Sequence, residues 1–102
     1  MSLFLTDHKL KARTRQATLT TTVQRIVGYS KRRVQIIIIN TSSQAAIIGR
    51  DSDLTSATGL SIEQNAALTW NKFFLDDCTH EFYGVTAATT ADVRIEETFD
   101  MI

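Results

Sequence analysis

The side chains that could bind a metal or take part in catalysis are concentrated between positions 76 and 81. These positions hold the chain's only cysteine, one of its two histidines and three acids, as Asp76, Asp77, Cys78, His80 and Glu81. A structural zinc site needs four ligands, mostly Cys and His, and the only other residue of these types is His8. We therefore expect an acidic turn here, with no metal and no cofactor.

Cys78 and His80 are the one pair in the chain that could act in nucleophilic catalysis. Residues two apart on a strand point to the same side, so the imidazole could accept the thiol proton. The sequence offers no identifiable oxyanion hole or orienting partner for this pair, and no nucleotide-binding or metalloprotease motif occurs. We predict that the protein is not an enzyme and assign it no catalytic residue.

The basic run Lys31-Arg32-Arg33 is the best candidate for binding nucleic acid through phosphate charge. Only Tyr29 lies beside it as a stacking ring. We favour the interpretation that these charges protect the very apolar strand that follows from edge-to-edge pairing. Binding to an acidic protein surface is the alternative, and nucleic acid is not an expected partner.

Most aromatic residues gather late in the chain, as Trp70, Phe73, Phe74, Phe82 and Tyr83. Phe73 and Phe74 are adjacent, so on a strand they would face opposite ways. One should enter the core, and the other should enter the core of a neighbouring sheet or an interface. The alternative is a sugar-binding face with Trp70 as its platform.

The elements that would carry these residues are β-strands. Fifteen Thr, ten Ile and five Val are β-branched, and such side chains suit a pleated sheet and disfavour helix. Strand-like runs separated by turn residues cover residues 18–27, 33–40, 45–48, 60–62, 66–75, 79–86 and 92–99. About seven short strands predict an all-β fold, an antiparallel β-sandwich of jelly-roll-like or Ig-like form.

Alternation along these strands predicts the core. In RVQIIIIN, residues 33–40, Ile36 and Ile38 point to one face of the strand, and Ile37 and Ile39 point to the other. A strand that is apolar on both faces belongs in the centre of a sheet, and in so short a chain one face is available to another subunit. The residues expected to be buried are Val34, Ile36, Ile38, Ile47, Leu68, Val85, Val93 and Ile95.

Residues 1–16 are predicted to form an extended arm ahead of a sandwich domain that spans residues 17–102. Four basic residues alternate in it and would share one face: Lys9, Lys11, Arg13 and Arg15. We expect the arm to be clamped onto a neighbouring subunit or host surface, with this basic row against carboxylates. A mobile tail, or a first strand of the chain's own sheet, is the alternative.

The net charge is zero, but the basic and acidic residues are distributed unequally along the chain. Residues 1–50 carry nine Lys or Arg against one acid, whereas residues 51–102 carry two against ten. Basic strands that pair with acidic ones inside the sheet would account for this division. The alternative is a folded unit with two opposite poles.

Three segments resemble small structural proteins of tailed bacteriophages: RVQIIIINTSSQAAIIG (33–49), SDLTSATGLSI (52–62) and HEFYGVTAATTADVRIEE (80–97). The resemblance implies a β-sandwich virion component that decorates or cements a capsid, or that belongs to a tail or fibre. It also implies trimers or symmetric sites on a shell, and it carries over no enzyme site.

We therefore expect a capsid decoration protein that bridges capsid subunits, with a tail or baseplate component and a carbohydrate-binding module as alternatives. Its expected partners are the major capsid protein or another virion protein and copies of itself, for example in a trimer, without a membrane. It would be assembled into virions in the host cytoplasm, because the apolar N-terminal start is too short for a signal peptide. The candidate interface residues are Leu3, Phe4, Leu5, Lys9, Lys11, Arg13, Arg15, Ile37, Ile39, Phe73 and Phe74.

Overall fold

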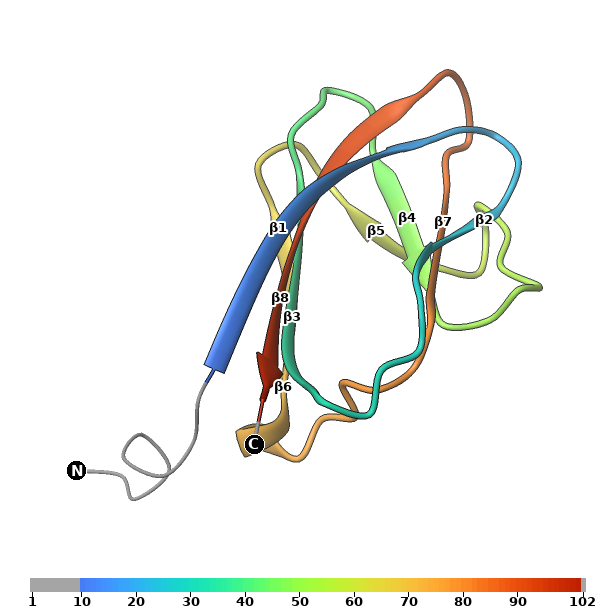
Figure 1. The fold of residues 1–102 in the computed structure, drawn as a ribbon. Coiled ribbons are helices and arrows are strands. Elements are labelled where there is room, and N and C mark those ends of the chain that lie inside the picture. The colour runs from blue at the N-terminus through green and yellow to red at the C-terminus, as the bar shows by residue number, and fades with distance from the viewer. Residues whose placement is uncertain (1–9, 102) are drawn as a thin grey trace.

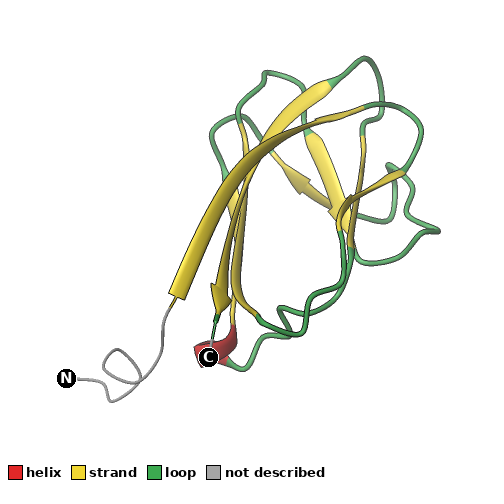
Figure 2. Ribbon diagram, in the orientation of Figure 1, coloured by secondary structure: helices red, strands yellow, loops and turns green. Residues whose placement is uncertain are grey.

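In the computed structural model, which describes residues 10–101, eight strands form two sheets that pack face to face (Figure 1). The strands are β1 (Leu10–Leu19), β2 (Gln24–Val27), β3 (Arg33–Asn40), β4 (Ala46–Gly49), β5 (Leu60–Ile62), β6 (Ala67–Asn71), β7 (Phe82–Val85) and β8 (Ala91–Asp100). The only helical element in this range is the 3-10 turn η1 (Lys72–Phe74), drawn in red beside the end of β8 in Figure 2. Residues 10–101 therefore contain no helix that could cross a membrane, which takes about 20 apolar residues.

The order of the strands identifies the topology. One sheet runs β1-β8-β3-β6 and the other runs β2-β7-β4-β5, with antiparallel neighbours throughout. The chain changes sheet after almost every strand, and its first and last strands are neighbours, as in an eight-stranded jelly roll. The predicted all-β antiparallel sandwich is confirmed in its jelly-roll form, because an Ig domain groups its strands differently.

Alternation along the strands places the core between the two sheets. Ile36 and Ile38 of β3 are fully buried there, and so are Val93 and Ile95 of the neighbouring β8. Seven of the eight predicted core residues are buried. Leu68 is only partly buried, because it lies on the edge strand β6 and packs against the core from there.

Two predicted strands differ most from the observed ones, and the strand predicted over residues 79–86 is shorter, as β7. Residues 18–27 do not form one strand: β1 ends at Leu19 and β2 begins at Gln24, because the chain crosses between the sheets here. The strand predicted over residues 66–75 ends at Asn71, where η1 begins. The prediction that Phe73 and Phe74 lie on opposite faces of a strand is therefore wrong.

The predicted arm is, from Leu10 onward, part of the sandwich. β1 pairs with β8 along its whole length, from Leu10 opposite Asp100 to Leu19 opposite Ala91. The predicted boundary between residues 16 and 17 is therefore wrong, and the alternative of a first strand in the chain's own sheet holds for residues 10–16. Leu3, Phe4, Leu5 and Lys9 lie outside the described residues.

The basic first half of the chain and its acidic second half pair with each other within the fold. The basic strand β1 lies against β8, which carries four of the chain's acids. On the other sheet, Arg25 of β2 pairs with Glu81, with its Nη1 2.7 Å from the carboxylate Oε2. The structure thus contains the internal pairing of basic and acidic strands, the first of the two predicted arrangements.

Candidate interaction surfaces

The acidic turn at residues 76–81 uses its polar side chains to shape its own backbone. An Asp76 carboxylate oxygen accepts a hydrogen bond from the N–H of Asn71 at 2.9 Å. Asp77 accepts bonds from the N–H and hydroxyl of Thr79, which lower the pKa of Asp77, and it pairs with His80 at 2.9 Å. Within residues 10–101, no three Cys, His, Asp or Glu side chains gather in a way that could hold a metal ion.

Cys78 and His80 do not form a nucleophilic pair. The Cys78 thiol is 2% exposed and donates to the carbonyl oxygen of Val34 at 3.4 Å, whereas His80 is exposed and bound to Asp77. Burial, followed by the negative charge of Asp76, raises the pKa of Cys78 above its usual value. A protonated, enclosed thiol is a poor nucleophile.

We expect the native protein to react very slowly with a thiol reagent such as Ellman's reagent, because Cys78 must be exposed before it can form the thiolate. In concentrated guanidinium chloride the reaction should be complete within the mixing time. A Ser52→Cys variant, whose added thiol lies in an exposed loop, is the matched control and should react quickly in native buffer. A native Cys78 that reacts as fast as this added thiol would contradict the assignment.

Glu97 is the centre of a buried ion-pair cluster. Its side chain and that of Arg33 are each 1% exposed, and the Arg33 Nη1 lies 3.0 Å from Glu97 Oε2. Arg13 and Arg15 of β1 reach the other carboxylate oxygen at 2.8 and 3.3 Å. Arg13 and Arg15 were predicted to face a partner; instead they meet a carboxylate of their own chain, because β1 lies next to β8. Lys11 is exposed on the same strand.

The buried Arg33 ties several loops to the first sheet. Its guanidinium donates to the carbonyl oxygens of Cys78 at 2.9 Å, Gly28 at 2.6 Å and His80 at 3.2 Å. This cluster holds the β2–β3 and β6–β7 connections in place. Its role is structural, and its buried members, Arg33 and Glu97, are not available to a partner.

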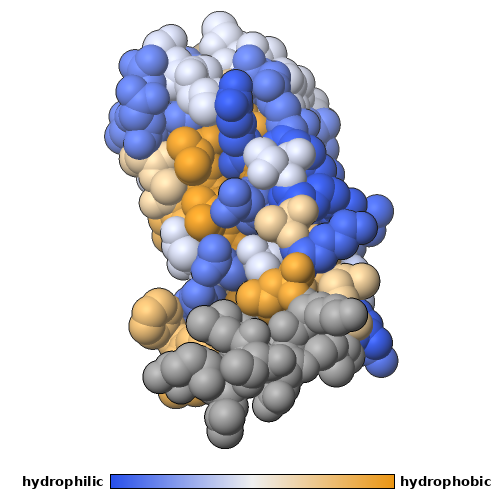
Figure 3. Space-filling model, turned by 60° about the vertical axis from the view of Figure 1, so that its left-hand side comes forward, coloured by the Kyte–Doolittle hydropathy of each residue, from blue (hydrophilic) through white to orange (hydrophobic). Residues whose placement is uncertain are grey.

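The outer face of the sheet β1-β8-β3-β6 carries Ile37 and Ile39. Ile39 is 37% exposed and Ile37 is half-buried. Figure 3 looks onto the side of the molecule where β1 lies and shows apolar areas bordered by hydrophilic side chains. Arg94 and Glu96, which lie opposite Ile39 and Ile37 on β8, divide this face. The apolar surface here is therefore narrow.

The most exposed apolar side chains lie in and after η1. Phe73, Phe74 and Leu75, which we call the apolar turn, are 59%, 78% and 96% exposed. Phe73 and Phe74 were named as interface candidates from the sequence, and the structure places both at the surface. Contiguous exposed side chains of this size are characteristic of interaction sites.

The apolar turn is held in a defined conformation. Asn71 accepts a hydrogen bond from the N–H of Phe73 at 2.8 Å and donates to Gln35 at 2.6 Å. The N–H groups of Leu75 and Asp76 close the turn on the carbonyl oxygens of Lys72 and Asn71. Leu75 has φ 67°, a left-handed conformation that costs an L-residue about 1–2 kcal/mol. Glycine usually occupies this position.

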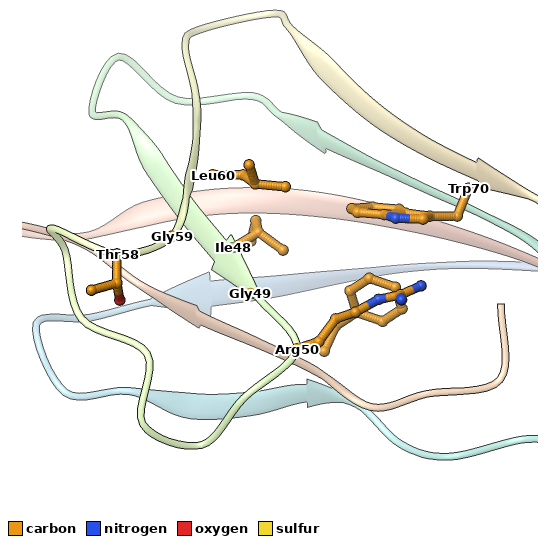
Figure 4. A pocket seen from close by; sticks show the side chains of 8 residues that line it. Ile48, Gly49, Arg50, Thr58, Gly59, Leu60 and Trp70 are labelled. Atoms are coloured by element: carbon orange, nitrogen blue, oxygen red, sulfur yellow. The ribbon is translucent and has the colours of Figure 1, made fainter. Parts of the chain in front are cut away.

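A recess of about 270 Å³ opens between the two sheets near β4 and β6 (Figure 4). It is lined by Ile48, Gly49, Arg50, Thr58, Gly59, Leu60, Trp70 and Phe82. The guanidinium of Arg50 lies 5.1 Å from the centre of the Phe82 ring and 5.7 Å from that of Trp70, and it donates to the carbonyl oxygen of Asp77. Leu60 is 55% exposed at its edge. The result is an apolar hollow with one cation at its side.

Close packing around Gly59 shapes the recess. A Cβ atom at this position would lie 2.4 Å from Ile47 and 2.6 Å from Leu54. A side chain at this position would not fit, and the backbone of Gly59 itself forms part of the wall of the recess. A second hollow adjoins it through Gly49, Arg50 and Thr58, and it is lined in addition by Asp51, Asp53 and Leu54.

Sequence reasoning did not select Leu75, Leu60 or Glu97 as important. Glu97 had a signal, since Val93 and Ile95 alternate inward and the next inward position is 97. Leu75 completes an apolar run of three residues that ends at two aspartates. Leu60 and Trp70 come together only through the packing of the two sheets, and no local pattern indicates it.

No family model matches the chain, and no curated protein sequence matches it. Among solved structures, a de novo designed double-stranded β-helix matches with a TM-score of 0.55 and 11% identity, over 83% of this chain and 97% of that one. A protein of Bacillus endospore appendages, which form disulfide-linked pili, matches with a TM-score of 0.53 and 10% identity, over 93% and 89%. At such identities the similarity shows the fold alone.

Proposed function

We propose that this protein is a virion structural protein, a capsid decoration protein that binds and bridges capsid subunits. The observation that carries the proposal is the apolar turn, whose large side chains are displayed to solvent at a strained backbone position. Strained backbone positions cluster at functional sites, and exposed apolar patches mark sites of interaction. The resemblance of three segments to phage structural proteins supports a virion as the setting.

The contacts of such an assembly would be non-covalent. The endospore appendage protein of similar fold belongs to pili that are disulfide-linked. In this chain the only thiol, Cys78, is buried and protonated, so it cannot link subunits without unfolding of its surroundings. Affinity would have to come from apolar burial and from charge complementarity.

The copy number of the protein in purified particles tests the proposal. We expect a number close to that of the major capsid protein, because a decoration protein occupies repeated sites on the shell. Quantitative mass spectrometry with the major capsid protein as internal standard would measure it. A few copies per particle would favour the tail or baseplate alternative, and absence from particles would exclude both.

A carbohydrate-binding module is the second candidate, and Trp70 is the observation that favours it. Its ring lines the recess together with Leu60 and Arg50 (Figure 4), and sugars pack on exposed aromatic faces beside polar donors. Trp70 is the chain's only tryptophan, so its fluorescence reports on this site alone. Saturable fluorescence changes with mono- or disaccharides would support this candidate, and a flat titration would remove it.

A further inference from the structure

Two features of the surface have complementary shapes. The apolar turn presents Phe74 and Leu75 outward, and the recess offers an apolar hollow of about 270 Å³. This volume is just below the range of pockets that hold drug-sized ligands, so it suits a group of about one or two side chains. Because Phe74 and Leu75 are largely exposed, the recess of the same chain does not receive them.

The charges around the two features are also complementary. The apolar turn follows directly on Lys72, which lines a shallow hollow beside it together with Lys31, Arg32 and one acid, Asp100. Asp76 and Asp77 follow the turn, but each is bound within its own loop region, to Asn71 and to Thr79 and His80 respectively. The hollow that adjoins the recess is lined by two exposed acids, Asp51 and Asp53, and by one cation, Arg50. Opposite charges at the rim of an apolar contact favour one orientation of the partners over others.

We propose that the apolar turn of one copy inserts into the recess of a second copy of this chain. Phe74 and Leu75 enter beside Leu60 and Trp70, and Lys72 and Lys31 approach Asp51 and Asp53. We infer a head-to-tail contact, in which every copy keeps one free turn or recess until a ring closes or a filament grows.

This inference deepens the proposed function by naming a second copy of this chain as the partner that the apolar turn meets, and it rests on that function for its setting. Its test uses the purified chain without capsids, so the two can fail separately. A chain that assembles but is absent from particles would overturn the proposed function only. A chain present in particles that does not assemble through these surfaces would overturn the inference only.

The test is complementation between two variants in sedimentation velocity. Phe74→Ser removes the ring from the turn, and Leu60→Asp places a charge in the recess; both positions are exposed, so the fold should be retained. We expect the unaltered chain to form species larger than dimers as its concentration rises, and each variant alone to remain monomeric. Their equimolar mixture should form a dimer and nothing larger, because exactly one working contact remains. Tyr29→Ser, at another exposed aromatic residue, is the control and should assemble as the unaltered chain does.

Three results would overturn the inference. The first is an unaltered chain that stays monomeric, or that stops at a dimer, at high concentration. The second is a mixture of the two variants that stays monomeric. The third is self-association that Phe74→Ser abolishes and Leu60→Asp leaves intact, which would mean that the turn meets a turn or another surface.

Leu75→Gly separates a binding role of the turn from a structural one. Glycine adopts the left-handed conformation without strain, so the thermal midpoint should stay the same or rise. Loss of the Leu75 side chain from the interface should nevertheless weaken self-association about tenfold or more, as expected of a buried anchor. A variant that is equally or more stable and assembles as well as the unaltered chain would show that the leucine has no role in the contact.

Discussion

Replacement of Glu97 by alanine is expected to lower the free energy of unfolding by about 3–5 kcal/mol, since it leaves a buried arginine without its counter-charge. Arg33 is as fully buried as Glu97, and its guanidinium cannot lose its proton at any ordinary pH. Arg13 and Arg15 would also lose the carboxylate that they share. Urea denaturation at neutral pH measures the change.

Glu96→Ala is the matched control for this prediction. Glu96 is the neighbouring residue on β8, but it lies on the exposed outer face, so its loss should change stability by less than about 0.5 kcal/mol. If Glu97→Ala cost as little as this control, the cluster would not contribute to stability.

The contribution of Glu97 should also depend on pH. Burial alone would raise its pKa, but the hydrogen bond and charge of Arg13 and the charge of Arg15 outweigh it, so the pKa of Glu97 lies below its usual value. A lowered pKa in the folded state adds stability that is complete above the unfolded pKa of about 4.3 and is lost as the pH falls through the folded value. The difference in stability between the unaltered chain and Glu97→Gln should therefore shrink below about pH 4.

Ile38→Ala is expected to cost about 2–5 kcal/mol, because it removes fully buried methyl and methylene groups and leaves a cavity. Ile38 lies in the middle of β3, between β8 and β6, where it faces Ile95 and Leu68 across the ladders. The surrounding strands cannot close around the gap without disturbing both pairings. Urea denaturation of the purified variant would measure the loss.

Ile39→Ala is the control for this cavity, because it makes the same chemical change one residue along the same strand. Ile39 points to the outer face and is partly exposed, so its truncation should cost no more than about 1 kcal/mol. Equal losses at the two positions would mean that the faces of β3 are misassigned.

Local patterns in the sequence were sufficient for the central strands. The bounds of β3 and β5 agree with the predicted residues 33–40 and 60–62. In β3 and β8 the side chains alternate between an apolar core and a mixed outer face, so a period of two residues is visible in the sequence. The all-β class follows from the same patterns and from the β-branched composition.

Features that depend on distant contacts could not be predicted from local patterns. Nothing near Leu10 indicates that β1 pairs with residues about seventy to ninety positions away. The basic row therefore suggested an arm, although Glu97, the carboxylate partner of Arg13 and Arg15, lies in the same chain. Similarly, the strand-like run through Phe73 and Phe74 ends early because Asn71 caps η1 and bonds to Gln35 on the adjacent strand.

The candidate interface was only partly accessible to sequence reasoning. The sequence predicts a strand for Phe73 and Phe74, which is the wrong local structure. Both side chains are nevertheless exposed, as an interface requires. No local pattern in the sequence predicts the recess, because its walls come from β4, β5, β6 and β7, which meet only in the folded sandwich.

The position of β8 between β1 and β3 has a consequence for the order of events during folding. Until residues 91–100 have been synthesised, β1 has no neighbour in its sheet and β3 lacks one of its two partners. The growing chain would meanwhile carry an excess of unpaired positive charge, which keeps its exposed strands apart. Completion of the first sheet therefore depends on joining residues that lie far apart in the sequence, and such long-range closure is slow. Until then, the edge of β3 that β8 covers stays open to other strands.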